Sequence, residues 1–173
     1  MSNRFKFLAV IFLLYLSFNS ALGQETQTEL SPPKRETRVR PEETAFVPNE
    51  NDIKSFVYRW FSWLDHRVEG FLFLYHLNKE DLLMKLPEAT IHSHDDFKKW
   101  YQSFCENSQS NTHEVSNIKV KSLANGRYSV DLSVLRRSKT PQGRTLDEKE
   151  RQNWELSVSA AGRLTINRYI IKK

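Results

Sequence analysis

The fold class follows from two alternating segments, residues 128–134, YSVDLSV, and residues 153–159, NWELSVS. In each of them apolar and polar residues alternate strictly. Successive side chains of a β-strand point to opposite faces of its sheet, so each stretch is predicted to be a strand with one buried face and one wet face. The alternation therefore predicts an antiparallel sheet whose apolar face needs a cover.

Turn signals divide residues 114–171 into four such strands. Asn125-Gly126 predicts a tight hairpin, because both residues tolerate positive φ. A second turn is expected at 160–162, AAG, and a longer loop at 139–146, which contains a proline and a glycine. The four strands are therefore expected to form a meander in which each strand pairs with the next.

The residues before the meander are expected to supply the cover. Three helices and one short strand are predicted there, in chain order the helix 52–66, the helix 69–77, the strand 81–86 and the helix 93–107. The first helix carries one apolar stripe at helical spacing, and Asn51 or Asp52 is expected to cap its start. Trp60, Trp100 and Leu156 are expected to be buried together where two helices meet the sheet.

The charge of the chain argues against a nucleic-acid partner. The 173 residues hold 26 basic and 21 acidic side chains, for a net charge of +5. The basic residues are scattered, apart from Arg136, Arg137 and Lys139, and are not interleaved with aromatic residues. Because electrostatic binding needs several phosphate contacts at once, no nucleic-acid partner is expected.

Residues 1–23 are predicted to be a signal peptide. Arg4 and Lys6 precede a 12-residue apolar core at 7–18, and the small residues Ala21 and Gly23 suit signal-peptidase cleavage. Cleavage there predicts a secreted or periplasmic protein. The alternative is an uncleaved anchor, but the apolar core is shorter than the ~20 residues of a membrane-spanning helix, so no stable span is expected after cleavage.

The other predicted boundaries follow from composition. Residues 24–50 contain four prolines, mixed charges and few apolar residues, so they are expected to be a disordered linker. Residues 51–173 are expected to form the one folded domain, which bears the net positive charge of the mature chain.

The side chains that can carry chemistry are few. Asp65 follows apolar residues at the end of the first predicted helix, where a carboxylate at the mouth of a cavity can act as a general base. His66 cannot share its helical face, because adjacent helical residues diverge by ~100°. The expected partner is therefore His76 or Tyr101, and the predicted catalytic residues are Asp65, His76 and Tyr101.

Metal and ligand candidates are weaker. His92 and His94 lie two apart, so on extended backbone both imidazoles can point one way, but no further ligand is evident. No metal or cofactor is therefore expected. A pocket for a small apolar or aromatic ligand is expected to be lined by aromatic residues, namely Trp60, Trp100, Tyr128 and Trp154.

The order of the elements and three segments carry a family resemblance. The segments are 57–65, VYRWFSWLD, 96–101, DFKKWY, and WEL at 154–156 followed by 166–170. Together they resemble the nuclear transport factor 2-like superfamily, also called SnoaL-like or cystatin-like, which includes ketosteroid isomerase. The resemblance implies an α+β fold in which N-terminal helices pack on a curved antiparallel sheet, forming a cone with a pocket between the sheet and the first helix.

The resemblance allows two functions. Its members include non-catalytic binding or dimerising modules and also isomerases, dehydratases and cyclases. The first hypothesis is an exported, non-catalytic ligand-binding or interaction domain, because the inward positions of 128–134 are apolar. The alternative is a small-molecule isomerase or dehydratase of the SnoaL or ketosteroid isomerase type. A carboxylate or imidazole that points into the cone would distinguish them.

The resemblance also implies a homodimer through the outer face of the sheet. The residues expected on that face are short or polar, namely Ser129, Asp131, Ser133, Glu155, Ser157 and Ser159. An antiparallel sheet can leave such a face in water, and short side chains permit close approach of a second copy.

Overall fold

The computed structural model describes residues 46–172. The predicted signal peptide and nearly all of the predicted linker lie outside the described residues. The linker was expected to extend to residue 50, but Glu50 is already helical. Within the described part of the chain, no helix is long and apolar enough to cross a membrane.

Six strands form one sheet in the order β2-β1-β6-β5-β4-β3. Their bounds are β1 (Leu83–Lys85), β2 (Thr90–Ile91), β3 (Ser110–Ser122), β4 (Tyr128–Lys139), β5 (Thr145–Val158) and β6 (Leu164–Lys172). The last four strands are the predicted antiparallel meander. The sheet as a whole is mixed, because β1 pairs with β6 in parallel. No hairpin joins β1 to β6, so no tight turn forces that pair to be antiparallel.

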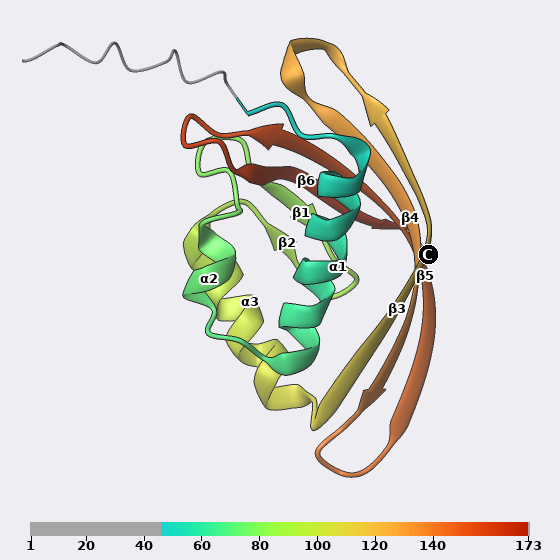
Figure 1. Ribbon diagram of the computed structural model, residues 1–173. Coiled ribbons are helices and arrows are strands. Elements are labelled where there is room, and N and C mark those ends of the chain that lie inside the picture. The colour runs from blue at the N-terminus through green and yellow to red at the C-terminus, as the bar shows by residue number, and fades with distance from the viewer. Residues whose placement is uncertain (1–45, 173) are drawn as a thin grey trace, which may run out of the picture. The chain divides into compact units, whose positions relative to one another are not determined.

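The turns use left-handed backbone where it was expected. Asn125 and Gly126 have φ of 59° and 66° between β3 and β4, and Gly162 has φ of 69° between β5 and β6. A register shift interrupts the pairing of β3 with β4 between Ser116 and Lys119, where Asn117 has φ of 55°. This bulge lets β3 bend with the curved sheet (Figure 1).

Three helices lie on one side of the sheet (Figure 1). They are α1 (Glu50–His66), α2 (Phe71–Leu74) and α3 (His94–Asn107). The cap of α1 is Asn49, not Asn51 or Asp52. Its side-chain oxygen accepts from the backbone N–H groups of Asn51 and Asp52 at 2.8 and 3.1 Å, while the Asp52 carboxylate accepts from the Asn49 N–H at 2.9 Å. This reciprocal pair starts the helix two residues earlier than expected.

Trp60 lies at the centre of the core. It is fully buried, and its ring centroid lies 4.8 Å from that of Phe73 and 6.1 Å from that of Trp154. Leu156 is also fully buried, as expected. Trp100 is only half-buried, because its indole N–H donates to the exposed Glu88 carboxylate at 2.9 Å. The indole therefore lies at the edge of the core and not inside it.

Candidate functional site

Asp65 and His113 form a buried acid–base pair between α1 and the inner face of β3. Asp65 lies in the last turn of α1. Its Oδ1 is 2.5 Å from His113 Nδ1, and its Oδ2 accepts from the His113 backbone N–H at 3.1 Å. The side chains are 5% exposed for His113 and 20% for Asp65. The carboxylate is thus held by two contacts to one residue, which fixes its orientation.

The geometry of this pair determines which imidazole nitrogen is available. A carboxylate oxygen accepts, so Nδ1 carries the proton that it donates to Asp65. In the neutral ring, Nε2 then has a free lone pair. Phe61 packs against the ring at a centroid distance of 5.1 Å and restricts its rotation. An imidazole oriented in this way by a carboxylate can act as a general base through Nε2.

Arg136 lies beside His113 on the neighbouring strand. The two residues are directly opposite in the β3–β4 pairing, and Glu148 is opposite Arg136 on β5. Arg136 donates to Glu148, and its Nε lies 3.9 Å from Glu150 Oε1. Burial disfavours the guanidinium charge, but the bond to Glu148 and the nearby carboxylates outweigh it, so the pKa of Arg136 is raised. The guanidinium of Arg136 therefore stays positively charged on the strand next to His113.

A small inner cavity of ≈ 30 Å³ adjoins the pair. Its lining includes His113, Arg136 and Glu150, together with the aromatic rings of Trp60, Trp100 and Tyr169. A cavity of this size holds only one or two water molecules. The charged and polar side chains therefore share this small space with aromatic and aliphatic ones.

A larger hollow of ≈ 210 Å³, here called the vestibule, adjoins the inner cavity. The two spaces share lining residues, namely Glu88, Trp100, Phe104 and Arg136. Asn111 lines the vestibule but not the inner cavity. It is opposite Ser138 in the pairing of β3 with β4. The shared wall places the vestibule next to the cavity that His113 lines.

Three buried polar atoms in this region have no hydrogen-bond partner within residues 46–172. They are Trp60 Nε1, Arg136 Nε and Asn111 Oδ1. Trp60 is fully buried and Asn111 is 6% exposed. Turning the amide of Asn111 would break a hydrogen bond, because its Nδ2 donates to Ser108 Oγ at 2.7 Å. Leaving a buried polar atom unpaired costs about 1–3 kcal/mol, so these atoms mark a place where a ligand would supply partners.

The structure does not bring the three predicted catalytic residues together. The partner of Asp65 is His113, whereas Tyr101 donates its hydroxyl to the Val68 carbonyl at 2.6 Å. His76 packs against Phe56 and Trp63 of α1, at 5.2 and 5.4 Å between ring centroids, and its Nδ1 contacts the Leu164 carbonyl oxygen at 2.8 Å. Tyr101 and His76 therefore anchor connections between elements, and neither hydrogen-bonds to Asp65.

The expected pocket residues separate in a similar way. Trp60 and Trp100 line the inner cavity. Trp154 lies in the core, where its indole N–H donates to Gln152 Oε1 at 3.1 Å. Tyr128 is buried further along β4 and does not line this cavity. Two of the four expected aromatic residues therefore line the cavity, and the lining also includes the aromatic residues Phe104 and Tyr169.

The two weak metal candidates do not converge. His94 directs Nε2 to the Leu77 carbonyl oxygen at 3.1 Å, and His92 is exposed. Within the described residues, no group of three His, Cys, Asp or Glu side chains is arranged to hold a metal ion.

Comparison with known proteins identifies the fold. No family model matches the sequence, and no curated protein matches it. Many solved structures do match in three dimensions, among them the following three. A nuclear transport factor 2-like superfamily protein from Salmonella enterica has a TM-score of 0.64 at 9% identity, covering 70% of this chain and 88% of its own. A candidate scytalone dehydratase from Novosphingobium aromaticivorans has a TM-score of 0.62 at 16% identity, covering 69% and 80%. A hexachlorocyclohexane dehydrochlorinase (LinA) type 2 has a TM-score of 0.62 at 9% identity, covering 69% and 81%.

The chain has the nuclear transport factor 2-like fold. The resemblance expected from the sequence and the α+β class are therefore confirmed. In this nuclear transport factor 2-like fold the polar site lies where the inner face of the sheet extends past the apolar core. An imidazole and carboxylates do line the cavity, which is the feature that was expected to distinguish a catalytic member from a binding module.

A simple signal in the sequence marks the residues that were missed. The alternation of 128–134 continues to Arg136 on the inner face, and the alternation of 153–159 extends backwards to Gln152 and Glu150. His113 falls one residue before the predicted start of the meander, because β3 begins at Ser110 and not at 114. Extending each strand at period two would have found the polar part of the inner face.

Proposed function

We propose that this protein is an enzyme that moves a proton on a small uncharged substrate, with His113 as its general base. One observation carries the proposal. Asp65 Oδ1 lies 2.5 Å from His113 Nδ1, and His113 lines a cavity whose lining also includes buried polar atoms without a hydrogen-bond partner. In the proposed reaction Nε2 of His113 takes a proton from a substrate carbon. The Asp65 carboxylate then stabilises the imidazolium that forms.

The unpaired donors suit the charge that such a reaction develops. When a carbon next to a carbonyl or a leaving group loses a proton, negative charge builds on the oxygen or the leaving atom. Trp60 Nε1 and Arg136 Nε both lack hydrogen-bond partners among residues 46–172 and belong to residues that line the cavity. Donors held in a water-poor site stabilise such a charge without reorganisation.

The charges around Arg136 favour an uncharged substrate. Three carboxylates, those of Glu88, Glu148 and Glu150, surround this one guanidinium, counting the weaker long-range effect of Glu88. An anionic substrate would be repelled by the excess of negative charge. The vestibule and the inner cavity together are smaller than the ~300–1,000 Å³ of a typical ligand pocket, so the substrate is expected to be small. The aromatic rings in the lining of the inner cavity favour a flat substrate.

The class of reaction favoured is an elimination or an isomerisation. Both begin with loss of a proton from carbon, which is the step that the Asp65–His113 pair suits. Two proteins that share the fold are named a candidate scytalone dehydratase and a dehydrochlorinase, and both names denote eliminations. Those names fit the proposal, which rests on the geometry of this chain.

A generic carbon acid tests the proposal before the substrate is known. The probe is 5-nitrobenzisoxazole, an uncharged flat molecule whose base-promoted ring opening releases a coloured phenolate. The protein is expected to accelerate ring opening beyond free imidazole at the same concentration, and His113→Gln is expected to abolish the acceleration. His92→Gln, a change at an exposed histidine, serves as the control and should leave the rate unchanged. A His113→Gln protein that folds and retains the parent rate would disprove the proposal.

A non-catalytic binding module is the second candidate. The observation that favours it is the volume of the inner cavity, ≈ 30 Å³, which leaves little room for a reacting group. Under this function the protein would bind 5-nitrobenzisoxazole or a similar flat ligand without opening its ring. The same assay, combined with a binding measurement, separates the two candidates.

Export is part of the proposal and rests on residues 1–23 alone. With the signal peptide removed, the enzyme would work outside the cytoplasm, in the periplasm or the surrounding medium. Sequencing of the mature protein tests this. The mature chain is expected to begin at Gln24, whereas mature protein that retains residues 7–18 would contradict export by cleavage.

A further inference from the structure

The face of the sheet opposite the helices is strongly cationic. Six of its exposed basic residues are called the cationic face below, namely Lys119, Lys121, Lys149, Arg151, Arg168 and Lys172. The pairing places them together, because Lys119 and Lys121 lie opposite Asp131 and Ser129, and Lys172 lies opposite Arg151. These strands bring basic side chains around the small polar residues that were predicted for this face.

The charges of the cationic face are not neutralised within the described residues. None of the six forms an ion pair there, whereas Lys54, Lys98 and Arg137 each pair with a carboxylate. The two central acidic residues of the same face are already engaged. Asp131 accepts from Asn153 Nδ2 at 2.9 Å, and Glu155 pairs with Arg127 at 2.6 Å. Unpaired positive charge is therefore concentrated on one side of the domain.

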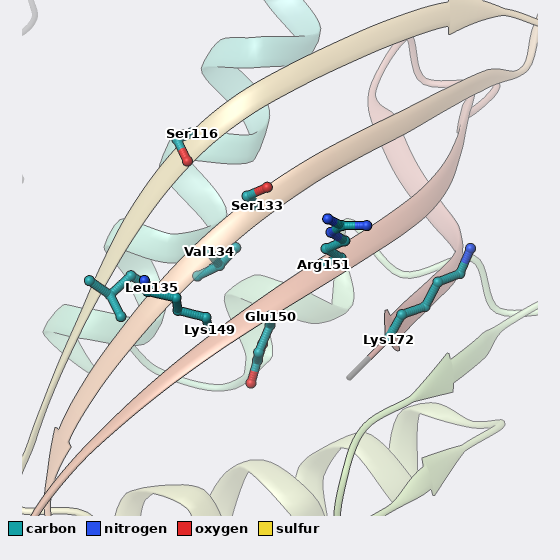
Figure 2. Close-up of a pocket in the computed structure, with 8 residues that line it drawn as sticks. All are labelled: Ser116, Ser133, Val134, Leu135, Lys149, Glu150, Arg151 and Lys172. Carbon is teal, nitrogen blue, oxygen red and sulfur yellow. The ribbon is translucent and has the colours of Figure 1, made fainter.

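The same face is hollowed. Two open hollows of ≈ 500 and ≈ 550 Å³ share Ser133, Arg151 and Lys172. Figure 2 shows Ser116, Ser133, Arg151 and Lys172 on four neighbouring strands, with the two basic side chains next to each other. These four residues form one row of the sheet, because each is the pairing partner of the next. Short serines thus leave open space beside long cations.

We propose that the cationic face binds an acidic, extended segment of a partner protein. Charge complementarity carries the proposal, since several carboxylates on one strand can meet several unpaired cations at once. The hollows admit the side chains of such a segment. This function is independent of the proposed chemistry at His113, which lies on the opposite face of the sheet.

The chemistry of the face disfavours the other occupants. The residues that line the hollows include no aromatic ring on which a nucleic-acid base could stack. They also include none of the exposed large apolar side chains that anchor a protein to a membrane surface. If a second copy of this chain bound through the same face, its six basic residues would meet the six of the first copy. Like charges across an interface are costly. The homodimer expected through this face is therefore less well suited to it than an acidic partner.

A matched pair of charge reversals tests the proposal with a fluorescein-labelled decaglutamate peptide as the probe. Lys121→Glu with Arg151→Glu replaces two positive charges of the cationic face by two negative ones. Lys98→Glu with Lys99→Glu makes the same change in net charge on exposed residues of α3. Fluorescence anisotropy at low salt is expected to show binding to the parent, roughly tenfold weaker binding to the face variant and less than about twofold change in the α3 variant. Binding should also weaken as salt is raised, because salt screens exposed charges.

Every other result counts against the proposal. Equal losses in the two variants would mean that the peptide responds to net charge and not to this face. Tighter binding of a labelled single-stranded DNA or of phosphatidylserine vesicles would replace the proposed partner by a nucleic acid or a membrane. Sedimentation that shows a dimer dissociated by the face variant would make a second copy the occupant. Thermal melting of both variants checks that they fold. If the face variant does not fold, Lys121→Gln with Arg151→Gln is used in its place.

Discussion

Asp65 and His113 lie 48 residues apart in sequence, and their side chains meet at 2.5 Å. The contact joins the last turn of α1 to the inner face of β3 and buries the imidazole almost completely. The same histidine also donates its backbone N–H to the carboxylate. One residue thus orients the carboxylate, and the carboxylate in turn orients the ring that we propose as the base.

The core is expected to depend on Trp60 far more than on Trp100. Trp60→Ala should lower the free energy of unfolding by about 3–5 kcal/mol, because a fully buried indole leaves a cavity that the core cannot refill. Trp100→Ala should cost less than about 2 kcal/mol, since that ring is half-buried and bonded to an exposed carboxylate. Urea unfolding of the two variants measures the difference, and equal costs would contradict the placement of the two rings.

The start of α1 is expected to depend on Asn49. Asn49→Ala should cost about 0.5–2 kcal/mol, because it removes the acceptor for two backbone N–H groups of the first turn. Asn51→Ala is the matched control, since Asn51 uses its backbone N–H and not its side chain in this cap. Thermal or urea unfolding reads out both variants. A larger loss for Asn51→Ala would place the cap where it was first expected.

Tyr101 is expected to support the fold without taking part in the chemistry. Tyr101→Phe removes only the hydrogen bond to the Val68 carbonyl, so it should cost about 0.5–1.5 kcal/mol of stability. The rate of ring opening of 5-nitrobenzisoxazole should stay at the parent level in the folded variant. A large loss of that rate with unchanged stability would restore Tyr101 as a catalytic residue.

His76 is expected to make the fold less stable in mild acid. Burial lowers the pKa of His76 below its usual 6.5, with a smaller contribution from Arg59 and Arg163, against the opposing bond to Leu164. As pH falls through 6.5, the unfolded chain therefore binds a proton at this residue before the folded chain does. Its contribution to stability is present above pH 6.5 and is lost as pH falls toward the lowered pKa.

The measurement for His76 compares urea midpoints at about pH 7.5 and about pH 5. His76→Gln should show a smaller drop between the two conditions than the parent. His92→Gln, at an exposed position, should drop as the parent does. An unchanged drop in His76→Gln would show that His76 does not contribute to acid sensitivity.

The sequence predicted the architecture better than the site, for a physical reason. Alternation in 128–134 and 153–159 reports a property of single strands, so the meander and its inner face followed from local pattern. Asp65 was also recognised, because the end of an apolar helix is a local feature. His113 is different, since its place beside Asp65 depends on how β3 pairs with β4 and on the bulge at Asn117. The core-facing apolar residues of β3 are Val115, Ile118 and Val120, whose spacing breaks strict alternation at the bulge, so local pattern alone does not give the register.

The capping of α1 shows a second kind of limit. Asn49, Asn51 and Asp52 are all good cap residues by type, and all three take part in the observed cap. Which of them supplies the accepting side chain depends on the path of the chain into the helix. The sequence pattern therefore located the helix start to within two residues.

The proposal that His113 is the base is tested most directly by determining which nitrogen of its ring carries the proton. A two-dimensional NMR spectrum that correlates the ring nitrogens with the carbon-bound ring protons of a nitrogen-15-labelled sample reports which nitrogen carries the proton. In the neutral form of the ring, Nδ1 is expected to carry the proton and Nε2 to be bare, and Asp65→Asn is expected to remove this preference while the domain stays folded. A neutral His113 ring that carries its proton on Nε2 in the parent protein would contradict the assignment of Nε2 as the base.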